Sequence, residues 1–456
     1  MPTRRNFLMT TASFAVAPSL RGAKAAPTPA TLTAAPARVQ IAPSSYPQTD
    51  VWAYNGQVPG QTLHYEQGDV LDVRFVNQLS EGSTIHWHGL RLPNAMDGVP
   101  NMTQPPVLPG DQFDYRFALR DAGTFWYHPH ANSVEQISRG LAGVLIVNEP
   151  TPPDVDRDEV LVLDDWRMTP EAGIHASFGS RHDMSHAGRL GNYITANARP
   201  DLTYEVAQGM RLRLRFVNTA TARIFRLSLK GMKAWVMALD GMPLPEARPA
   251  SEITIAPAQR ADLIVDITDD SEALIASVER EGSFALAAFA VSGTAQPQRP
   301  APTALPSNDL PHLALAEART VPLLMEGGAM RGLPDGATWK GQQMGFQQLA
   351  EAGQFWAFNG RAGSGEAPFV SAGLGETIRI PITNRTAFSH AMHLHGTHFR
   401  EVLPDGALGP WRDTLLVAPD EMREIAFVAE NLGDWMFHCH MPSHQMAGMM
   451  NWIQVV

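Results

Sequence analysis

The chain has 456 residues, 44% of them hydrophobic, and its 46 acidic and 35 basic side chains give a formal net charge of −11. This length allows several packed domains. The acidic balance argues against nucleic acid as a partner, because a phosphate backbone attracts basic surfaces. A single cysteine, Cys439, excludes an internal disulfide, so core packing and any bound metal must stabilise the fold.

The first residues have the pattern of an export signal. The run "TRRNFL" (3–8) is a twin-arginine pattern, and the apolar run 7–17 is too short to span a bilayer. Small residues at 23 and 25 offer a cleavage site. We therefore expect a twin-arginine signal peptide at 1–25 and export of the folded chain to the periplasm by the twin-arginine translocase. Its removal takes away four basic residues and no acids, so the formal charge goes from −11 to −15. No membrane span is expected in the rest of the chain.

Three segments of the chain repeat the same order of short motifs. In the first copy "VRFVN" (73–77) precedes "HWHG" (86–89), and in the last copy "IPITN" (380–384) precedes "HLHG" (393–396). The middle copy keeps "LRFVN" but has no His-x-His pair after it. The middle repeat is therefore expected to keep the scaffold without the chemistry.

Each copy consists of short β-rich runs separated by Gly, Pro and Asn, which is typical of a Greek-key sandwich. Pro-rich joints lie near 148–158 and 294–311. We predict an all-β protein with three Greek-key β-sandwich domains, at 40–150, 151–300 and 311–456.

The stretch "FHCHMPSHQMAGMM" (437–450) places the one cysteine between two histidines. Its aromatic and apolar start, ending at Pro442, predicts a short strand. Side chains alternate across a strand, so His438 and His440 would face one side and Cys439 the other. The pattern suggests two metal sites joined by a few covalent bonds.

The residues near Cys439 on its face of the strand indicate a copper site. A cysteine, two histidines and a weak axial methionine form a blue-copper centre, and Cys439, His444 and Met449 supply all but one histidine. A buried free cysteine is the ordinary alternative. Zinc is a second alternative, although structural zinc sites commonly use two or more cysteines.

Four His-x-His pairs stand at matching places in the first and last repeats. In an extended segment each pair presents two imidazoles on one strand face. Imidazole suits copper, zinc and iron, but only copper also explains the cysteine set. These eight histidines could meet in one site between the first and last domains: His86 and His88, His128 and His130, His393 and His395, and His438 and His440.

The motifs "HWHG", "HPH", "HAMHLHG" and "HCHMPSHQMAGM" together resemble those of the multicopper oxidases, a group that includes laccases and bacterial copper-efflux oxidases. The resemblance extends from about residue 45 to the C-terminus. It implies cupredoxin-like domains, four copper ions per chain, and one-electron oxidation of small donors coupled to the reduction of dioxygen to water.

The resemblance also implies a ligand set, position by position. Electrons would pass from the type 1 copper through Cys439 to the flanking His438 and His440, while His398 lies near the cluster without matching a ligand. The implied ligands are His390, Cys439, His444 and Met449 for the type 1 copper, His86 and His393 for type 2, His88, His128 and His438 for one type 3 copper, and His130, His395 and His440 for the other.

Two further positions concern the protons that oxygen reduction consumes. Asp97, in "NAMDGVP", matches an acidic residue that many family members place beside the cluster, where a carboxylate can relay protons. A turn aspartate before Gly98 is the alternative interpretation. Gln445, which cannot titrate, stands where bacterial members often have a glutamate.

The donor is predicted from the residues before "HAMHLHG". Thr386 and Phe388 occupy positions where relatives specialised for cuprous ions have an acidic residue and a methionine. We therefore predict laccase-like oxidation of phenols or aromatic amines, with periplasmic cuprous oxidation or copper tolerance as the alternative. Twenty methionines would also suit copper sequestration, although methionine equally fills irregular cores. A scaffold that has lost its metals is the third possibility.

One further stretch resembles a metal-binding loop. The segment "HASFGSRHDMSH" (175–186) contains three histidines, but it falls in the middle repeat. Because that repeat lacks the His-x-His pairs, we expect a solvated loop there.

Overall fold

The computed structural model describes residues 29–268 and 273–456, so the expected signal peptide at 1–25 lies outside the described residues. Within those two ranges, no helix combines the length and apolar character that a membrane crossing needs.

The N-terminal part of the chain forms two sheets around one apolar core. Its elements are β1 (Ala30–Val39), β2 (Thr49–Tyr54), β3 (Gly60–Glu66), β4 (Val70–Asn77), β5 (His86–His88), η1 (Asn94–Met96), β6 (Gln112–Ala118), β7 (Gly123–His128), α1 (Ser133–Ser138) and β8 (Gly143–Asn148). The strand orders are β2-β1-β4-β6 and β3-β8-β7-β5. Leu32 and Phe75 from the first sheet and Phe125 and Leu145 from the second share the core.

The middle part repeats this plan with larger sheets. Its elements are β9 (Arg157–Trp166), α2 (Arg181–Ser185), β10 (Tyr193–Ala196), β11 (Thr203–Val206), β12 (Arg211–Asn218), β13 (Phe225–Lys230), β14 (Met232–Leu239), β15 (Met242–Ala250), β16 (Glu252–Ile255), β17 (Arg260–Ile267), β18 (Ala273–Glu279) and β19 (Gly282–Val291). The orders are β10-β9-β12-β17-β14-β15 and β11-β19-β18-β13-β16.

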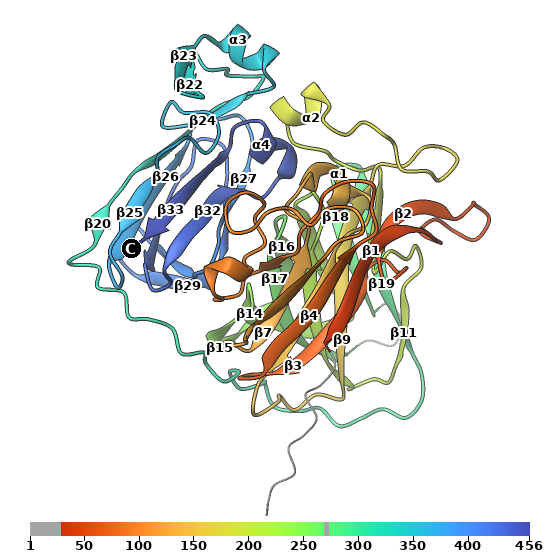
Figure 1. Ribbon diagram of the computed structural model, residues 1–456. Coiled ribbons are helices and arrows are strands. Elements are labelled where there is room, and N and C mark those ends of the chain that lie inside the picture. Colours follow the sequence, from red (N-terminus) through yellow and green to blue (C-terminus); the bar gives the residue numbers. More distant parts are fainter. Residues whose placement is uncertain (1–28, 269–272) are drawn as a thin grey trace, which may run out of the picture.

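The C-terminal part forms the third pair of sheets. Its elements are β20 (Arg319–Thr320), β21 (Leu323–Gly327), β22 (Ala337–Trp339), β23 (Gln342–Met344), α3 (Phe346–Glu351), β24 (Trp356–Phe358), β25 (Val370–Ala372), β26 (Thr377–Asn384), β27 (His390–Leu394), β28 (Phe399–Val402), β29 (Leu408–Arg412), β30 (Thr414–Val417), β31 (Met422–Val428), β32 (Gly433–Cys439), α4 (Pro442–Met446) and β33 (Met450–Val455). The orders are β24-β21-β26-β31-β28-β29, with β20 beside β26, and β25-β33-β32-β27-β30. The short β22-β23 hairpin and α3 stand at the top of Figure 1.

The motif that repeats in the sequence is the same strand in all three sandwiches. "VRFVN", "LRFVN" and "IPITN" are the ends of β4, β12 and β26. Each strand ends at a fully buried asparagine (Asn77, Asn218 or Asn384), and each side-chain amide donates one hydrogen bond to a carbonyl of the loop that follows and another to a carbonyl much further along the chain. Because the amide satisfies buried carbonyls, the asparagine fixes the turn that leads to the next strand. The prediction of an all-β fold built from sandwiches is confirmed.

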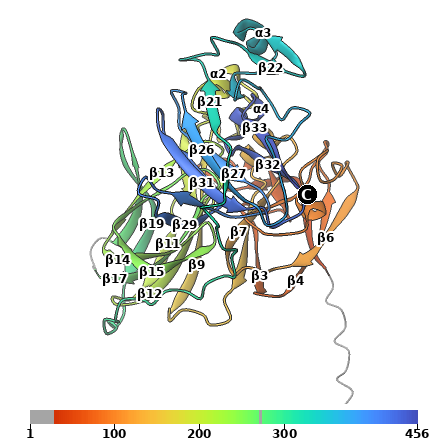
Figure 2. The same ribbon diagram turned by 90° about the vertical axis from the view of Figure 1, so that its left-hand side faces the viewer.

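Each sandwich contacts the other two. Strand β7 contacts β12 and β17, β29 contacts β14 and β15, and η1 contacts β32. Figures 1 and 2 show the resulting arrangement, with the blue C-terminal sandwich above the orange N-terminal and green middle ones.

One buried arginine joins the three sandwiches. Arg260, the first residue of β17, donates to both carboxylate oxygens of Asp413 at 2.6 and 3.0 Å and to the Thr124 carbonyl at 3.1 Å. Arg260 and Asp413 are fully buried. Burial disfavours the charged carboxylate, but the attraction of Arg260 outweighs it and holds the pKa of Asp413 well below its usual value. The pair is therefore ionised, and each charge depends on the other.

Replacing this arginine should strongly destabilise the protein. Arg260→Met would leave the Asp413 charge buried without its partner, and breaking a buried ion pair in this way costs about 3–5 kcal/mol. We expect a clear fall of the melting temperature in scanning calorimetry. Arg331→Met is the matched control, because the Arg331–Asp420 pair is solvent-exposed and its loss should change the melting temperature far less. Equal shifts in the two variants would contradict the importance of the buried pair.

Candidate metal centres

The histidines singled out in the sequence gather into two buried groups. The larger group contains all eight histidines of the four His-x-His pairs, and the smaller contains His390, Cys439 and His444. All ten histidines and the cysteine are at most 7% exposed. The arrangement matches the expectation of two separate sites.

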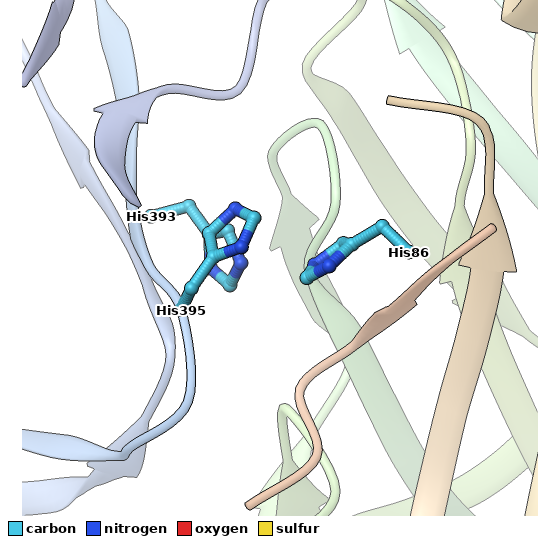
Figure 3. A group of neighbouring side chains, drawn as sticks. All are labelled: His86, His393 and His395. Atoms are coloured by element: carbon cyan, nitrogen blue, oxygen red, sulfur yellow. The ribbon is translucent and has the colours of Figure 1, made fainter. Parts of the chain in front are cut away.

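The larger group lies where the N-terminal and C-terminal sandwiches meet. β5 pairs with β7 so that His86 is opposite His128, and β27 pairs with β32 so that His393 is opposite His438. Figure 3 shows His86 reaching from β5 toward His393 and His395 on the facing sandwich. The His86 and His395 ring centroids are 4.0 Å apart.

The outward nitrogen of many of these rings is held by an oxygen. His86 Nδ1 donates to the Asp97 carbonyl at 2.7 Å, and His393 Nδ1 donates to the Asp413 carbonyl at 2.9 Å. The remaining contacts of this kind join His395 Nδ1 to Asp97 Oδ2 (2.8 Å), His88 Nε2 to Asp413 Oδ1 (3.1 Å), His128 Nδ1 to the Pro129 carbonyl (3.0 Å) and His438 Nδ1 to the Cys439 carbonyl (2.9 Å). Such contacts are typical of metal-ligating histidines, because they fix the tautomer and aim the other nitrogen at the metal.

The inward nitrogens lack ordinary partners. Within the described part of the chain, His86 Nε2, His88 Nδ1 and His393 Nε2 are buried without a hydrogen bond. Buried polar atoms are normally satisfied, so converging unsatisfied nitrogens indicate a missing electrophile. Copper fits this donor set, because imidazole nitrogen is one of its preferred ligands.

Burial also keeps these imidazoles in the form that binds metal. Loss of solvation, reinforced by the neighbouring histidines, holds the pKa of His128, His395 and His440 well below the usual value. The rings are therefore neutral at physiological pH, and their lone pairs are available.

The structure corrects one detail of the expected type 3 ligand sets. His438 lies with His130 and His395, and its Nε2 is 3.0 Å from His395 Nε2. His440 lies instead beside His128, with 3.3 Å between their Nε2 atoms, and its ring centroid is 4.8 Å from that of His88. The expectation that grouped His438 with His88 and His128, and His440 with His130 and His395, is wrong. Both histidines do lie on the same strand face, and only the interface between the sandwiches decides which cluster each one joins.

The smaller group surrounds the cysteine. His390 Nδ1 and His444 Nδ1 lie 3.6 and 3.8 Å from Cys439 Sγ, and 3.2 Å from each other. Met449 is fully buried in the same core, and its carbonyl accepts the Cys439 amide at 3.0 Å. Burial raises the pKa of the Cys439 thiol to about 12 and lowers that of His444 to about 4. A thiolate here therefore needs a bound cation to compensate its charge.

Asp97 lies where the proton relay was expected. It is fully buried, and its carboxylate contacts His395 at 2.8 Å and His86 at 3.2 Å. It therefore touches two histidines of the larger group from opposite sandwiches. Gln445, by contrast, donates to Met436 Sδ at 3.4 Å, and none of its hydrogen bonds within residues 29–268 and 273–456 goes to a carboxylate.

Sequence reasoning missed Asp413. Its Oδ1 lies 3.1 Å from His88 Nε2 and 3.5 Å from His393 Nδ1, and His398 Nε2 is 3.9 Å from its other oxygen. Thr414, the next residue, is opposite His393 in the β27–β30 pair. No spacing in the sequence marks Asp413, because the strand that follows it is brought to the cluster only by this pairing.

Three residues lie around the smaller group: Thr386, Phe388 and His186. Thr386 is fully buried, and its hydroxyl lies 2.8 Å from His390 Nε2. Phe388 is half-buried and packs edge-on against Trp356. The outward nitrogen of His444 donates to the His186 carbonyl at 2.7 Å. The 175–186 segment, predicted as a solvated loop, has exposed side chains at His175 and His182 and also contacts the smaller group through its last residue.

Comparison with known proteins agrees with this geometry. Three family models described as multicopper oxidase match residues 36–152, 157–290 and 340–456. The crystal structure of Lac15 from a marine microbial metagenome is 39% identical, covers 94% of this chain and 100% of its own, and has a TM-score of 0.77. A multi-copper oxidase from Pseudomonas thermotolerans is 32% identical, with coverages of 94% and 99% and a TM-score of 0.82. Multicopper oxidase MmcO of Mycobacterium tuberculosis is 29% identical over 448 residues, covering 92% of this chain and 85% of that protein.

Both the interdomain histidine cluster and these matches lead to one conclusion. The chain belongs to the multicopper oxidase family, whose members have cupredoxin-like domains, bind four copper ions and use a reducing substrate and oxygen.

Proposed function

We propose that this multicopper oxidase is laccase-like and oxidises phenols or aromatic amines by outer-sphere electron transfer. The observation that carries the proposal is the aromatic rim of the cysteine group. Phe388 lies edge-on to Trp356 and to His186, with ring centroids 5.9 Å apart in both pairs. Thr386, buried and bonded to His390, offers no ligand to a substrate ion.

We infer the copper ligands from the grouping of donor atoms. His86 and His393 are proposed for the type 2 copper. The other proposed sets are His390, Cys439, His444 and axial Met449 for type 1, His88, His128 and His440 for one type 3 copper, and His130, His395 and His438 for the other. Bound copper supplies the one-electron redox chemistry that reduces dioxygen to water.

The chain's own residues have three roles in this proposal. Cys439 and its neighbours His438 and His440 connect the two groups through the backbone, so electrons need not cross solvent. The buried imidazoles exclude water from the larger group. Asp97 places a carboxylate beside His395 and His86, where it can relay the protons that oxygen reduction consumes.

We propose that the enzyme works in the periplasm. The support is the twin-arginine pattern at 3–8 followed by a short apolar run. Export of a folded chain by the twin-arginine translocase would suit a protein whose metal sites need the folded interface.

Removing the thiol should remove the blue colour. In Cys439→Ser a hydroxyl replaces the thiolate, so the intense visible band from thiolate-to-copper charge transfer should disappear along with donor oxidation. Copper content should fall from four to about three per chain, since the eight histidines are untouched. Met441→Leu, a volume-conserving change in the same core, should keep the band. A serine variant that stays blue and active would show that Cys439 is not a ligand.

Neutralising Asp97 should slow turnover without removing copper. In Asp97→Asn the amide oxygen can still accept the His395 hydrogen bond, but the amide cannot exchange a proton. Steady-state oxygen uptake should fall by about 10²–10⁴-fold, with copper content and visible absorption unchanged. Asp111→Asn, at an exposed turn aspartate of the same sandwich, is the control. A wild-type rate for Asp97→Asn at every pH would leave Asp97 as a turn residue only.

The donor preference can be measured directly. Oxygen consumption with 2,6-dimethoxyphenol should give a higher specificity constant than with a stabilised cuprous complex, and should not require added cupric ion. The physical reason is that Phe388 and Trp356 offer an aromatic contact. If the cuprous complex is the better donor, or phenol oxidation depends on added copper, the enzyme is a cuprous oxidase and the proposal of an aromatic donor is wrong.

A further inference from the structure

The loop between β9 and β10 leaves the middle sandwich and docks on the C-terminal one. It carries α2, which contacts α4. Trp356 Nε1 donates to the Met184 carbonyl at 2.6 Å, and Arg181 donates to the Ala350 carbonyl at 2.7 Å. Figure 1 shows α2 beside the upper end of the C-terminal sandwich. Two residues of α2, Arg181 and Met184, therefore hold the helix against the C-terminal sandwich.

This loop covers the cysteine group. His444 is fully buried, and its only outward nitrogen is bonded to the His186 carbonyl. A donor in solution therefore cannot touch the His444 ring. His186 is partly exposed, and its carbonyl contacts that ring directly. The main chain of His186 therefore links its own imidazole to His444.

His186 does not stand alone. The ring of His182, four residues earlier on α2, is stacked on it with a centroid separation of 4.0 Å and an interplanar angle of 9°. The His182 side chain is 75% exposed. His186 Nδ1 is held by the His182 carbonyl (3.1 Å) and the Ser185 hydroxyl (3.0 Å), which leaves Nε2 as the atom available to a ligand. His186 caps the C-terminal end of α2, so the two imidazoles are separated by four residues, a spacing at which histidines commonly chelate transition metals. Because the rings are stacked, the exposed His182 ring must rotate for both to bind one ion.

The donor atoms available near His182 and His186 determine which metal ion would bind there. The carboxylate of Asp183, between the two histidines, is engaged by Arg167 through both oxygens at 2.7 and 2.9 Å. The available donors are therefore imidazoles rather than carboxylates. Such a pair prefers copper or zinc to calcium or magnesium, which require oxygen ligands.

We propose that His182 and His186 form a docking site for a copper ion on the donor side of the cysteine group. The inference rests on the proposed function, because it concerns the surface at which that enzyme takes up electrons. A docked cuprous ion would be a second class of donor: each ion loses one electron and becomes cupric, and four such electrons with four protons convert dioxygen to two waters. The His186 main chain connects the docked ion to His444.

The test is zinc binding to the copper-loaded enzyme, because zinc is redox-inert and shares the ligand preference. Calorimetric titration should find one zinc site per chain. His182→Gln and His186→Gln should each weaken it at least tenfold, since loss of even a residue behind a ligand typically costs about 10–100-fold in metal affinity. His175→Gln removes an exposed imidazole of the same loop outside α2 and should leave zinc binding and oxygen uptake unchanged.

Two further readouts link the site to the cysteine group. Zinc should shift the visible absorption of the wild type, because the His186 carbonyl is bonded to His444, and should not do so in His182→Gln. The zinc-free spectra of both glutamine variants should match the wild type, because that carbonyl belongs to the main chain. The KM for a stabilised cuprous complex should rise at least tenfold in His182→Gln and remain unchanged in His175→Gln.

The docking site is disproved if the wild type binds no zinc at millimolar concentration, or if both glutamine variants bind it as tightly as the wild type. Oxygen uptake with dimethoxyphenol on the same samples tests the proposed function separately. Phenol oxidation without zinc binding would refute only the docking site. Zinc binding at the pair in a protein that oxidises no phenol would support the site and refute the aromatic donor.

Discussion

The structure depends on the convergence of buried imidazole nitrogens between two sandwiches. His86 and His88 come from β5, and His393 and His395 come from β27 on the facing sandwich, so neither sandwich holds the cluster alone. Buried nitrogens without a hydrogen-bond partner, such as His86 Nε2 and His393 Nε2, are costly. A bound cation removes this cost and at the same time ties the two sandwiches together. The affinity for the metal and the stability of the interface between the sandwiches are for this reason thermodynamically coupled.

The middle sandwich has no His-x-His pair, yet it is not a passive spacer. Through Arg260 it neutralises Asp413, and Asp413 holds His88 with its carboxylate and His393 with its carbonyl. The charge that orients two histidines is thus balanced from a third part of the chain. Without this arginine the Asp413 charge would be buried without a partner, and the acceptor that orients His88 would be destabilised. The ligand-free repeat therefore supports the cluster electrostatically.

The same sandwich also controls access to the smaller group. Its loop covers His444 with a main-chain carbonyl, which fixes the tautomer of that imidazole and moves the contact surface for donors outward to α2 and Phe388. The two groups remain separated by one layer of backbone, because Cys439 and its flanking histidines point to opposite faces of β32. In the proposed function, donor uptake and oxygen reduction are therefore assigned to different groups, which short covalent paths through β32 connect.

The sequence by itself determined the all-β class, the threefold repeat, the four His-x-His pairs and the short motif around Cys439, because strand alternation and motif spacing are local properties. The places of His390 and Asp97 were implied only by the resemblance to a family. Tertiary structure alone decided that His438 joins His130 and His395 while His440 joins His128, since both histidines face the same side of β32 and differ only in their neighbours across the interface. It also decided that Asp413 and Arg260 meet at the cluster and that the His186 carbonyl covers His444. These contacts join positions more than 150 residues apart, and no periodicity or spacing in one sequence encodes which distant surfaces will pack together.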